Sequence, residues 1–283
     1  MSAYKTNFAF LAMVVIASGA VAAAASVPVS YLTPDSFSAA TGAQVKLHVE
    51  SGSALSTQMQ AWPDDKLQWF FTRANGTQQN RDTVKALEPQ GREVAVTITQ
   101  PGVTVIGYDS KPLVTNVAPA EFQAFLSKNV STGALKAGSR DGGPDRIVQV
   151  RRVESATTMI RVSADGVGAY SSATALSKTG QAVEIRPLFD PTLVKPGSDL
   201  PVRVYVGGSK KAGAKVQATS VNGNQTVSVL ADPTGVANFR IDQAGTWRIE
   251  FHHAEALAGD PAAEWSLYSA TLTFEVGSEG AQK

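Results

Sequence analysis

Apolar and polar residues alternate with a period of two in several stretches of the second half of the chain. The alternation covers residues 200–206, 216–218 and 227–229, and it is clearest in 247–252. In that last stretch the apolar members are Trp247, Ile249 and Phe251, and the polar members are Arg248, Glu250 and His252. Successive side chains of a strand point to opposite faces, so this pattern predicts strands with one face in a core and the other in water.

Turn signals separate these predicted strands. They are Lys195-Pro196-Gly197, Gly207-Gly208, Asn222-Gly223, Asp232-Pro233-Thr234-Gly235 and Ala244-Gly245. Gly and Asn adopt positive φ at low cost, and Pro presets the first dihedral angle of a turn. Short strands with turns at this spacing predict an immunoglobulin-like β-sandwich domain over residues 179–277, followed by a C-terminal tail at 278–283.

The first half of the chain is also rich in predicted strands. Apolar residues alternate at 45–49 and 94–98, and an apolar, aromatic run occupies 67–73. Tight connections between alternating strands are typical of antiparallel sheets, so we expect a second antiparallel β-sandwich domain over residues 26–178. The alternation of apolar and polar residues is weakest around residue 178, so we place the domain boundary there.

One segment departs from the strand pattern. In residues 119–129, Phe122, Phe125 and Leu126 recur at helical spacing. Pro119 suits the first position of a helix, because the N–H that it lacks would have no partner there. The segment therefore predicts a short amphipathic helix packed on a sheet, with both Phe residues in the core. The predicted fold class is mainly β: two antiparallel β-sandwich domains, the second immunoglobulin-like, with one short helix.

The first 25 residues have the pattern of a signal peptide. Lys5 supplies a positive charge, residues 8–16 form an apolar core, and Ala23-Ala24-Ala25 suits cleavage after Ala25. The alternative, a membrane anchor, needs about 20 apolar residues to span a bilayer, and this apolar core is shorter. We therefore expect residues 1–25 to be removed and the mature chain to be periplasmic or secreted, without stable insertion in the membrane.

Composition narrows the possible functions. The chain has 283 residues and no cysteine, which excludes disulfides, thiolate metal sites and cysteine nucleophiles. Loss of Lys5 with the signal peptide leaves 24 basic residues against 24 acidic ones. Without a basic stripe, the chain is not expected to bind nucleic acid.

Enzyme motifs are missing from the sequence. There is no phosphate-binding loop, no dinucleotide fingerprint and no G-x-S-x-G elbow. The chain has three histidines, so counting does not exclude a Ser-His-acid triad, but no motif indicates one. We therefore expect no enzymatic activity and no catalytic residues.

Three residues are candidate metal ligands: Glu250, His252 and His48. Glu250 and His252 are two positions apart on a predicted strand and share a face, whereas the neighbouring imidazole of His253 points the other way. His48 lies on the polar face of its own strand. The alternative is that all three are solvated residues on outer faces, and we favour it because a ligand pair at this spacing often arises by chance.

Several short motifs together carry a family resemblance. They are Glu184-Ile185-Arg186-Pro187, Asp190-Pro191, Pro196-Gly197, Ala212-Gly213-Ala214, and Gly245-Thr246-Trp247-Arg248-Ile249 followed by His252. In this order they resemble a large family of exported bacterial proteins of unknown function, whose members are often labelled as the periplasmic component of a nickel or cobalt transport system. The resemblance covers most of the mature chain and implies its fold and a periplasmic role in metal uptake.

The start of the mature chain departs from that family. Such proteins typically begin with a histidine-rich stretch, whereas residues 26–34 contain no histidine. Metal ions such as nickel, cobalt and zinc are bound largely by imidazole and thiolate ligands. We therefore expect divalent metal to bind weakly or not at all, and we expect no cofactor.

Two functions remain as hypotheses. The first is a non-enzymatic envelope protein that binds a partner protein or polymer through an exposed patch, for which Trp62, Trp69 and Trp265 are candidates unless they lie in the core. The second is a periplasmic accessory protein for uptake of a divalent metal or a small solute, which requires several convergent ligands.

Overall fold

The computed structural model describes residues 27–81, 84–89, 91–131, 147–163 and 170–278. The expected signal peptide at 1–25 and all but the first residue of the expected tail lie outside these ranges. In the ranges that are described, no helix is long and apolar enough to cross a membrane. The fold is mainly β, as predicted, and the described residues form three sheets and one α-helix.

The three sheets are named here by position. The N-terminal sheet contains β1 (Val29–Pro34), β3 (Gln44–Ser53), β4 (Ser56–Met59) and β7 (Glu93–Thr97). The central sheet has the order β15 (Gln225–Leu230), β14 (Lys215–Ser220), β17 (Gly245–Ala256), β18 (Trp265–Val276), β10 (Val148–Ser163), β8 (Gly102–Ser110), β5 (Leu67–Ala74) and β6 (Thr77–Arg81). Two short strands, β2 (Ser38–Ala40) and β9 (Leu113–Val117), also pair with β10. The C-terminal sheet contains β11 (Val183–Pro187), β12 (Ser198–Val206), β13 (Ser209–Lys210) and β16 (Val236–Ile241).

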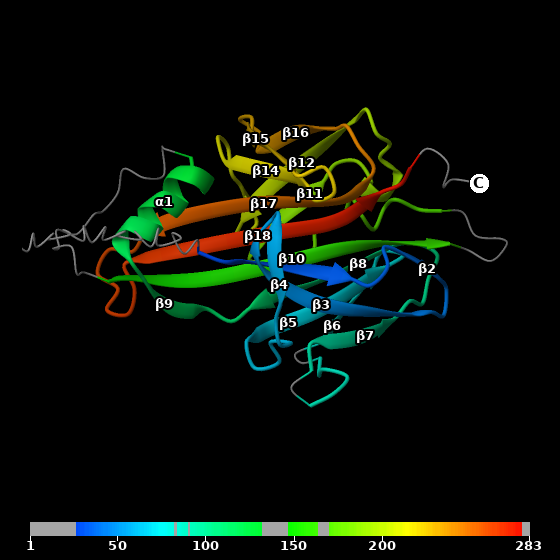
Figure 1. Ribbon diagram of the computed structural model, residues 1–283, viewed down its shortest axis with the longest axis horizontal. Helices are drawn as coiled ribbons and strands as arrows, with labels where there is room; N and C mark the ends of the chain where they lie inside the picture. Colours follow the sequence, from blue (N-terminus) through cyan, green and yellow to red (C-terminus); the bar gives the residue numbers. More distant parts are fainter. Residues whose placement is uncertain (1–26, 82–83, 90, 132–146, 164–169, 279–283) are drawn as a thin grey trace, which may run out of the picture.

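The central sheet contains strands from both halves of the chain. The long strand β10 pairs in parallel with β18, in a register that runs from Val150↔Trp265 to Thr158↔Thr273. Figure 1 shows β17, β18 and β10 side by side along the long axis of the molecule. The predicted boundary at residue 178 falls between β10 and β11, so this sheet crosses it. Pairing is antiparallel elsewhere, except between β2 and β10.

The two smaller sheets cover opposite faces of the central sheet. On one face, the C-terminal sheet buries a core that includes Phe71, Val105 and Met159. On the other face, the N-terminal sheet buries the alternate residues Phe70, Ile106 and Ile160. Neighbouring residues of one strand thus enter different cores, which follows from the period of two in side-chain direction. The molecule has three β layers.

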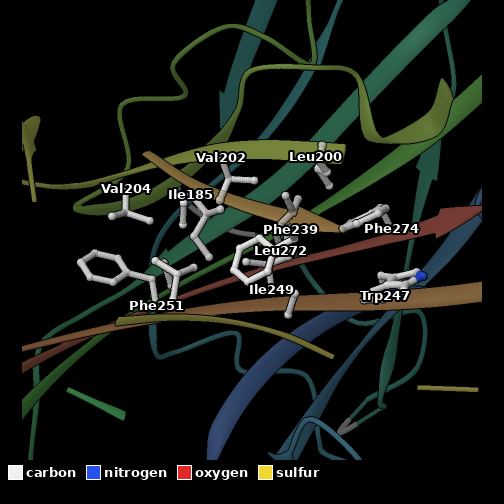
Figure 2. Close-up of a cluster of buried hydrophobic side chains, with 14 of the residues drawn as sticks. Ile185, Leu200, Val202, Val204, Phe239, Trp247, Ile249, Phe251, Leu272 and Phe274 are labelled. Carbon is white, nitrogen blue, oxygen red and sulfur yellow. The ribbon is translucent and has the colours of Figure 1, made fainter. Parts of the chain in front are cut away.

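The predicted core of the second half is confirmed. Trp247 is 3% exposed, and Ile249 and Phe251 are fully buried. Figure 2 shows Val202 and Val204 of β12 facing the side chains of β17 and β18 in this core. Two other tryptophans lie in different cores: Trp62 packs under the N-terminal sheet, and Trp265 packs beside the helix. Trp69 is partly buried.

The prediction for the other face of β17 was wrong. Arg248, Glu250 and His252 were expected in water, but they are 5%, 8% and 2% exposed. They lie on the face that the N-terminal sheet and the helix cover, because the two halves share one sheet. The alternating pattern identified the faces correctly but could not show that a second layer covers the polar one.

The predicted helix is confirmed. Helix α1 (Pro119–Asn129) has Pro at its start, and Phe122, Phe125 and Leu126 are buried. They pack with Val29 and Tyr31 of β1 and with Trp265. Figure 1 shows α1 beside one end of β17. The helix therefore closes the end of the polar face of β17.

Candidate functional site

Glu250 lies in a hydrogen-bonded cluster between the central and N-terminal sheets. Tyr31 of β1 donates its hydroxyl to Glu250 Oε1 at 2.6 Å. His252 Nε2 lies 3.2 Å from Glu250 Oε2, and His252 Nδ1 lies 3.0 Å from Ser269 Oγ. The register of β17 and β18 places His252 directly opposite Ser269. The structure therefore brings together the two predicted residues Glu250 and His252, as their shared face required.

Burial and hydrogen bonding set the charges in this cluster. Burial alone would raise the pKa of Glu250. The hydrogen bond with His252, the charge of His252 and the hydrogen bond from Tyr31 all lower this pKa, and together they hold it below its ordinary value. Burial and the neighbouring Glu250 raise the pKa of Tyr31. These shifts favour the neutral, donating form of Tyr31 and the charged, accepting form of Glu250.

His48 belongs to a second cluster, centred on Glu50. His48 Nε2 lies 3.0 Å from Glu50 Oε1, and Thr57 Oγ1 and Arg248 Nη2 both donate to Glu50 Oε2. The hydrogen bond with His48, together with that from Thr57 and the charge of Arg248, outweighs burial and lowers the pKa of Glu50 to about 2. The polar faces of the two halves do meet, but His48 pairs with Glu50 and not with Glu250.

Arg248 and Tyr31 connect the two clusters. The guanidinium of Arg248 lies 4.7 Å from the centre of the Tyr31 ring, at cation–π distance. Its Nη1 donates to the carbonyl oxygen of Ala54 at 3.0 Å. The roles of Tyr31, Glu50 and Arg248 could not be predicted from the sequence, because no local pattern links positions about 200 residues apart. The predicted divergence of His253 is observed, and its Nε2 lies 2.8 Å from Glu255 Oε1.

Ser269, His252 and Glu250 have the contacts of a Ser-His-acid triad. In such a triad the imidazole bonds the serine hydroxyl through one nitrogen and the carboxylate through the other. Here the side chain of His252 is 1% exposed and Ser269 is 3% exposed. The Phe125 ring covers the imidazole at 5.1 Å between ring centres. Both side chains are thus almost closed off from solvent, and this geometry favours a structural role.

The same residues do not fit a nickel or cobalt site. Of the three candidate ligands, only Glu250 and His252 come together, because His48 pairs with Glu50. A specific site for these ions needs several convergent nitrogen or oxygen ligands. Across the described ranges, no group of three or more His, Cys, Asp or Glu residues could hold a metal ion.

A cavity of about 330 Å³ lies beside Glu250, between the two halves of the chain. Its walls come from β1, the β3–β4 hairpin, α1, β14, β15 and β17, and its apolar part includes Val29, Leu55 and Phe125. Its polar part includes Gln217 and Asn129, whose amides share a hydrogen bond of 2.8 Å. We call it the helix cavity. No sequence pattern indicates this cavity, because its walls come together only in the folded chain.

The fold and this site define a mainly β, layered sandwich protein with charged clusters and a cavity between its halves. The chain belongs to the family described as Domain of unknown function (DUF4198), whose model matches residues 29–255. This confirms membership of a family of unknown function. A comparison with curated proteins found no match.

Comparison with solved structures found immunoglobulin-like and fibronectin-like proteins at low similarity. Clostridium thermocellum CbhA fibronectin(III)-like modules match at 10% identity and a TM-score of 0.22, over 89% of this chain and 97% of that chain. Murine CEACAM1b matches at 11% identity and a TM-score of 0.20, over 88% and 99%. Escherichia coli alpha-2-macroglobulin activated by porcine elastase matches at 16% identity and a TM-score of 0.22, over 89% and 22%. These matches say nothing about function.

Proposed function

We propose that this protein is an exported, non-enzymatic binding module of the bacterial envelope, which holds a small, partly apolar solute in the helix cavity. One observation carries the proposal: a buried carboxylate, held in place by two partners, borders a cavity with apolar and polar walls at the junction of the two halves. Small-molecule sites usually combine apolar contact area with polar groups that converge on the ligand.

The charge network supports this role by fixing the position of Glu250. Tyr31 and His252 each hold one of its oxygens, so the carboxylate does not need to reorient when a solute binds. Asn129 and Gln217 add donors and acceptors for orientation, and the apolar residues Val29 and Phe125 supply contact area. A solute with an apolar body and a hydrogen-bond donor facing Glu250 fits these walls. The buried Ser269 hydroxyl favours binding over catalysis.

Native mass spectrometry of the protein released from the envelope tests this function. We expect the wild-type protein to carry a copurified low-mass solute. Ala124 lines the helix cavity, and Ala124→Trp should fill the cavity and remove the solute. Ala120 is also exposed on α1 but does not line the cavity, so Ala120→Trp is the matched control and should keep the solute. A bare wild-type protein, or a solute retained in both variants, would contradict the proposal.

Export is tested on the same material. If the signal peptide is removed as proposed, the chain recovered from the periplasm or the medium begins at Ser26. Mass spectrometry of the N-terminal peptide identifies this end directly. An intact N-terminus at Met1 or Ser2, recovered with membranes, would show an anchor instead.

A further inference from the structure

A second cavity, of about 290 Å³, lies on the opposite side of β1 from Glu250. Val29 and Tyr31 point toward the helix and Glu250, so the alternate residues Pro28 and Ser30 point into this second cavity. The other walls come from β3, the segment between β4 and β5, the start of β5, the end of β8 and β10. We call it the lysine cavity, after Lys66 and Lys111 in its lining.

The lining of the lysine cavity carries more positive than negative charge. Arg152, Lys66 and Lys111 line it, and Glu154 is the carboxylate among the lining residues. Glu154 is already engaged, because Arg152 contacts one of its oxygens and Ser30 Oγ donates to the other at 2.5 Å. The two lysines form no ion pair with any described residue, although Lys111 Nζ donates to the backbone oxygen of Asp65 at 3.0 Å. Among the described residues, the positive charges of these two exposed lysines therefore have no carboxylate partner.

Arg152 also contributes positive charge to this lining. Its side chain is 14% exposed, and its Nη2 donates to the carbonyl oxygen of Pro28 as well as to Glu154. Its Nε is buried and has no hydrogen-bond partner in the part of the chain that is described. Because this atom is closed off from solvent, Arg152 acts on a molecule in the lysine cavity through its positive charge.

We infer that the lysine cavity binds a small organic dicarboxylate. Arginine and lysine form charge-assisted hydrogen bonds to carboxylates, and Ser51 and Ser110 add hydroxyl groups to the lining. The volume corresponds to roughly ten water molecules at about 30 Å³ each, which suits a short-chain diacid. Val49 and Leu67 give an apolar wall for its carbon chain.

Calorimetric titration of the purified protein with succinate tests this inference. We expect saturable binding of succinate and none of succinamide, which has a similar shape but no charge. The double variant Lys66→Ala/Lys111→Ala should lower the affinity by about tenfold or more, because it removes two charge-assisted contacts. Lys46 is an exposed lysine of β3 that pairs with Glu93 and does not line the cavity, so Lys46→Ala should bind succinate as the wild type does.

Three results would overturn the inference. They are the absence of saturable succinate binding up to millimolar concentration, binding that the double lysine variant retains, and tighter binding of inorganic phosphate through the same lysines. The last result would assign the cavity to phosphoryl anions. Ala124→Trp fills the helix cavity only, so it should leave succinate binding unchanged, and the two proposed sites can fail separately.

Discussion

At the scale of single residues, the polar face of β17 shows how charges are accommodated between two packed layers. Removing a charge from water is costly unless the group is paired and hydrogen-bonded. Arg248 pairs with Glu50 of β3, and Glu250 bonds Tyr31 of β1 and His252 of its own strand. Each of these buried charges therefore has a partner. These contacts join the N-terminal sheet to the central sheet.

Glu50→Gln should destabilise the protein at neutral pH by roughly 3–5 kcal/mol, because Arg248 then remains buried without its carboxylate. The hydrogen bond with His48, more than any other single contact, lowers the pKa of Glu50 from 4.5 to about 2. A lowered carboxyl pKa stabilises the fold above the unfolded pKa, and this stabilisation is lost as the pH falls through the folded pKa. The stability difference between wild type and variant should therefore shrink from pH 4.5 to about 2.

Urea denaturation at several pH values measures this difference. Glu93→Gln is the control, because Glu93 forms an exposed ion pair with Lys46, which contributes less than about 1 kcal/mol. An equal effect of both substitutions, or a Glu50→Gln effect that does not depend on pH, would show that the buried cluster does not stabilise the fold.

Trp247→Ala should cost roughly 3–5 kcal/mol, the usual effect of truncating a buried aromatic side chain. Thermal unfolding followed by circular dichroism measures the loss. Phe189 is 46% exposed, so Phe189→Ala should lower the melting temperature much less. An unchanged melting temperature in Trp247→Ala would contradict the position of this residue in the core.

At the scale of elements, strand β8 shows how closely the layers approach. Gly107 lies where the Phe71 ring of β5 crosses β8, next to the backbone of β10. A Cβ atom at this position would lie 2.7 Å from both Phe71 Cε1 and the Ala156 carbonyl oxygen. Glycine here allows an aromatic side chain to pack directly on the backbone of the neighbouring strand.

Gly107→Ala should therefore destabilise the protein by about 1–3 kcal/mol through overpacking. At Gly277 a Cβ atom would have no neighbour within 4 Å and φ is not positive, so Gly277→Ala is the matched control and should be neutral. Chemical denaturation of the two variants makes the comparison. Equal stabilities would show that Phe71 or β10 moves aside without cost.

At the scale of the whole molecule, the parallel pairing of β10 with β18 makes one sheet out of strands from both halves. Backbone hydrogen bonds cross the predicted boundary along nine residue pairs, from Val150↔Trp265 to Thr158↔Thr273. The contacts of Glu50 with Arg248 and of Tyr31 with Glu250 also join the halves. Without the other half, β10 or β18 would leave an unpaired edge in the central sheet.

The protein should therefore unfold in a single cooperative transition, even though its sequence predicts two sandwich domains. Differential scanning calorimetry should show one peak, with equal calorimetric and van't Hoff enthalpies. Residues 179–277 expressed alone should lack this stability, because β18 loses its partner β10 and presents an open edge. Two resolved transitions, or a stable isolated second half, would contradict this expectation.

The sequence by itself determined the local features of this protein. Alternation identified the buried face of β17, turn residues separated the strands of the second half, and helical spacing identified Pro119–Asn129. These features depend on φ/ψ preferences and on side-chain direction, which a few neighbouring residues set. The presence of strands and a helix could therefore be predicted.

Only the tertiary structure decided which strands share a sheet and what covers the second face of β17. Pairing between β10 and β18 uses backbone groups that every residue carries, so no side-chain pattern marks it. The burial of Glu250 depends on Tyr31, which lies 219 residues earlier in the chain. Both cavities are formed by elements brought together from across the chain. The period of two shows only to which face of the sheet each side chain points. An alternating strand therefore has the same sequence pattern whether water or another layer covers its polar face.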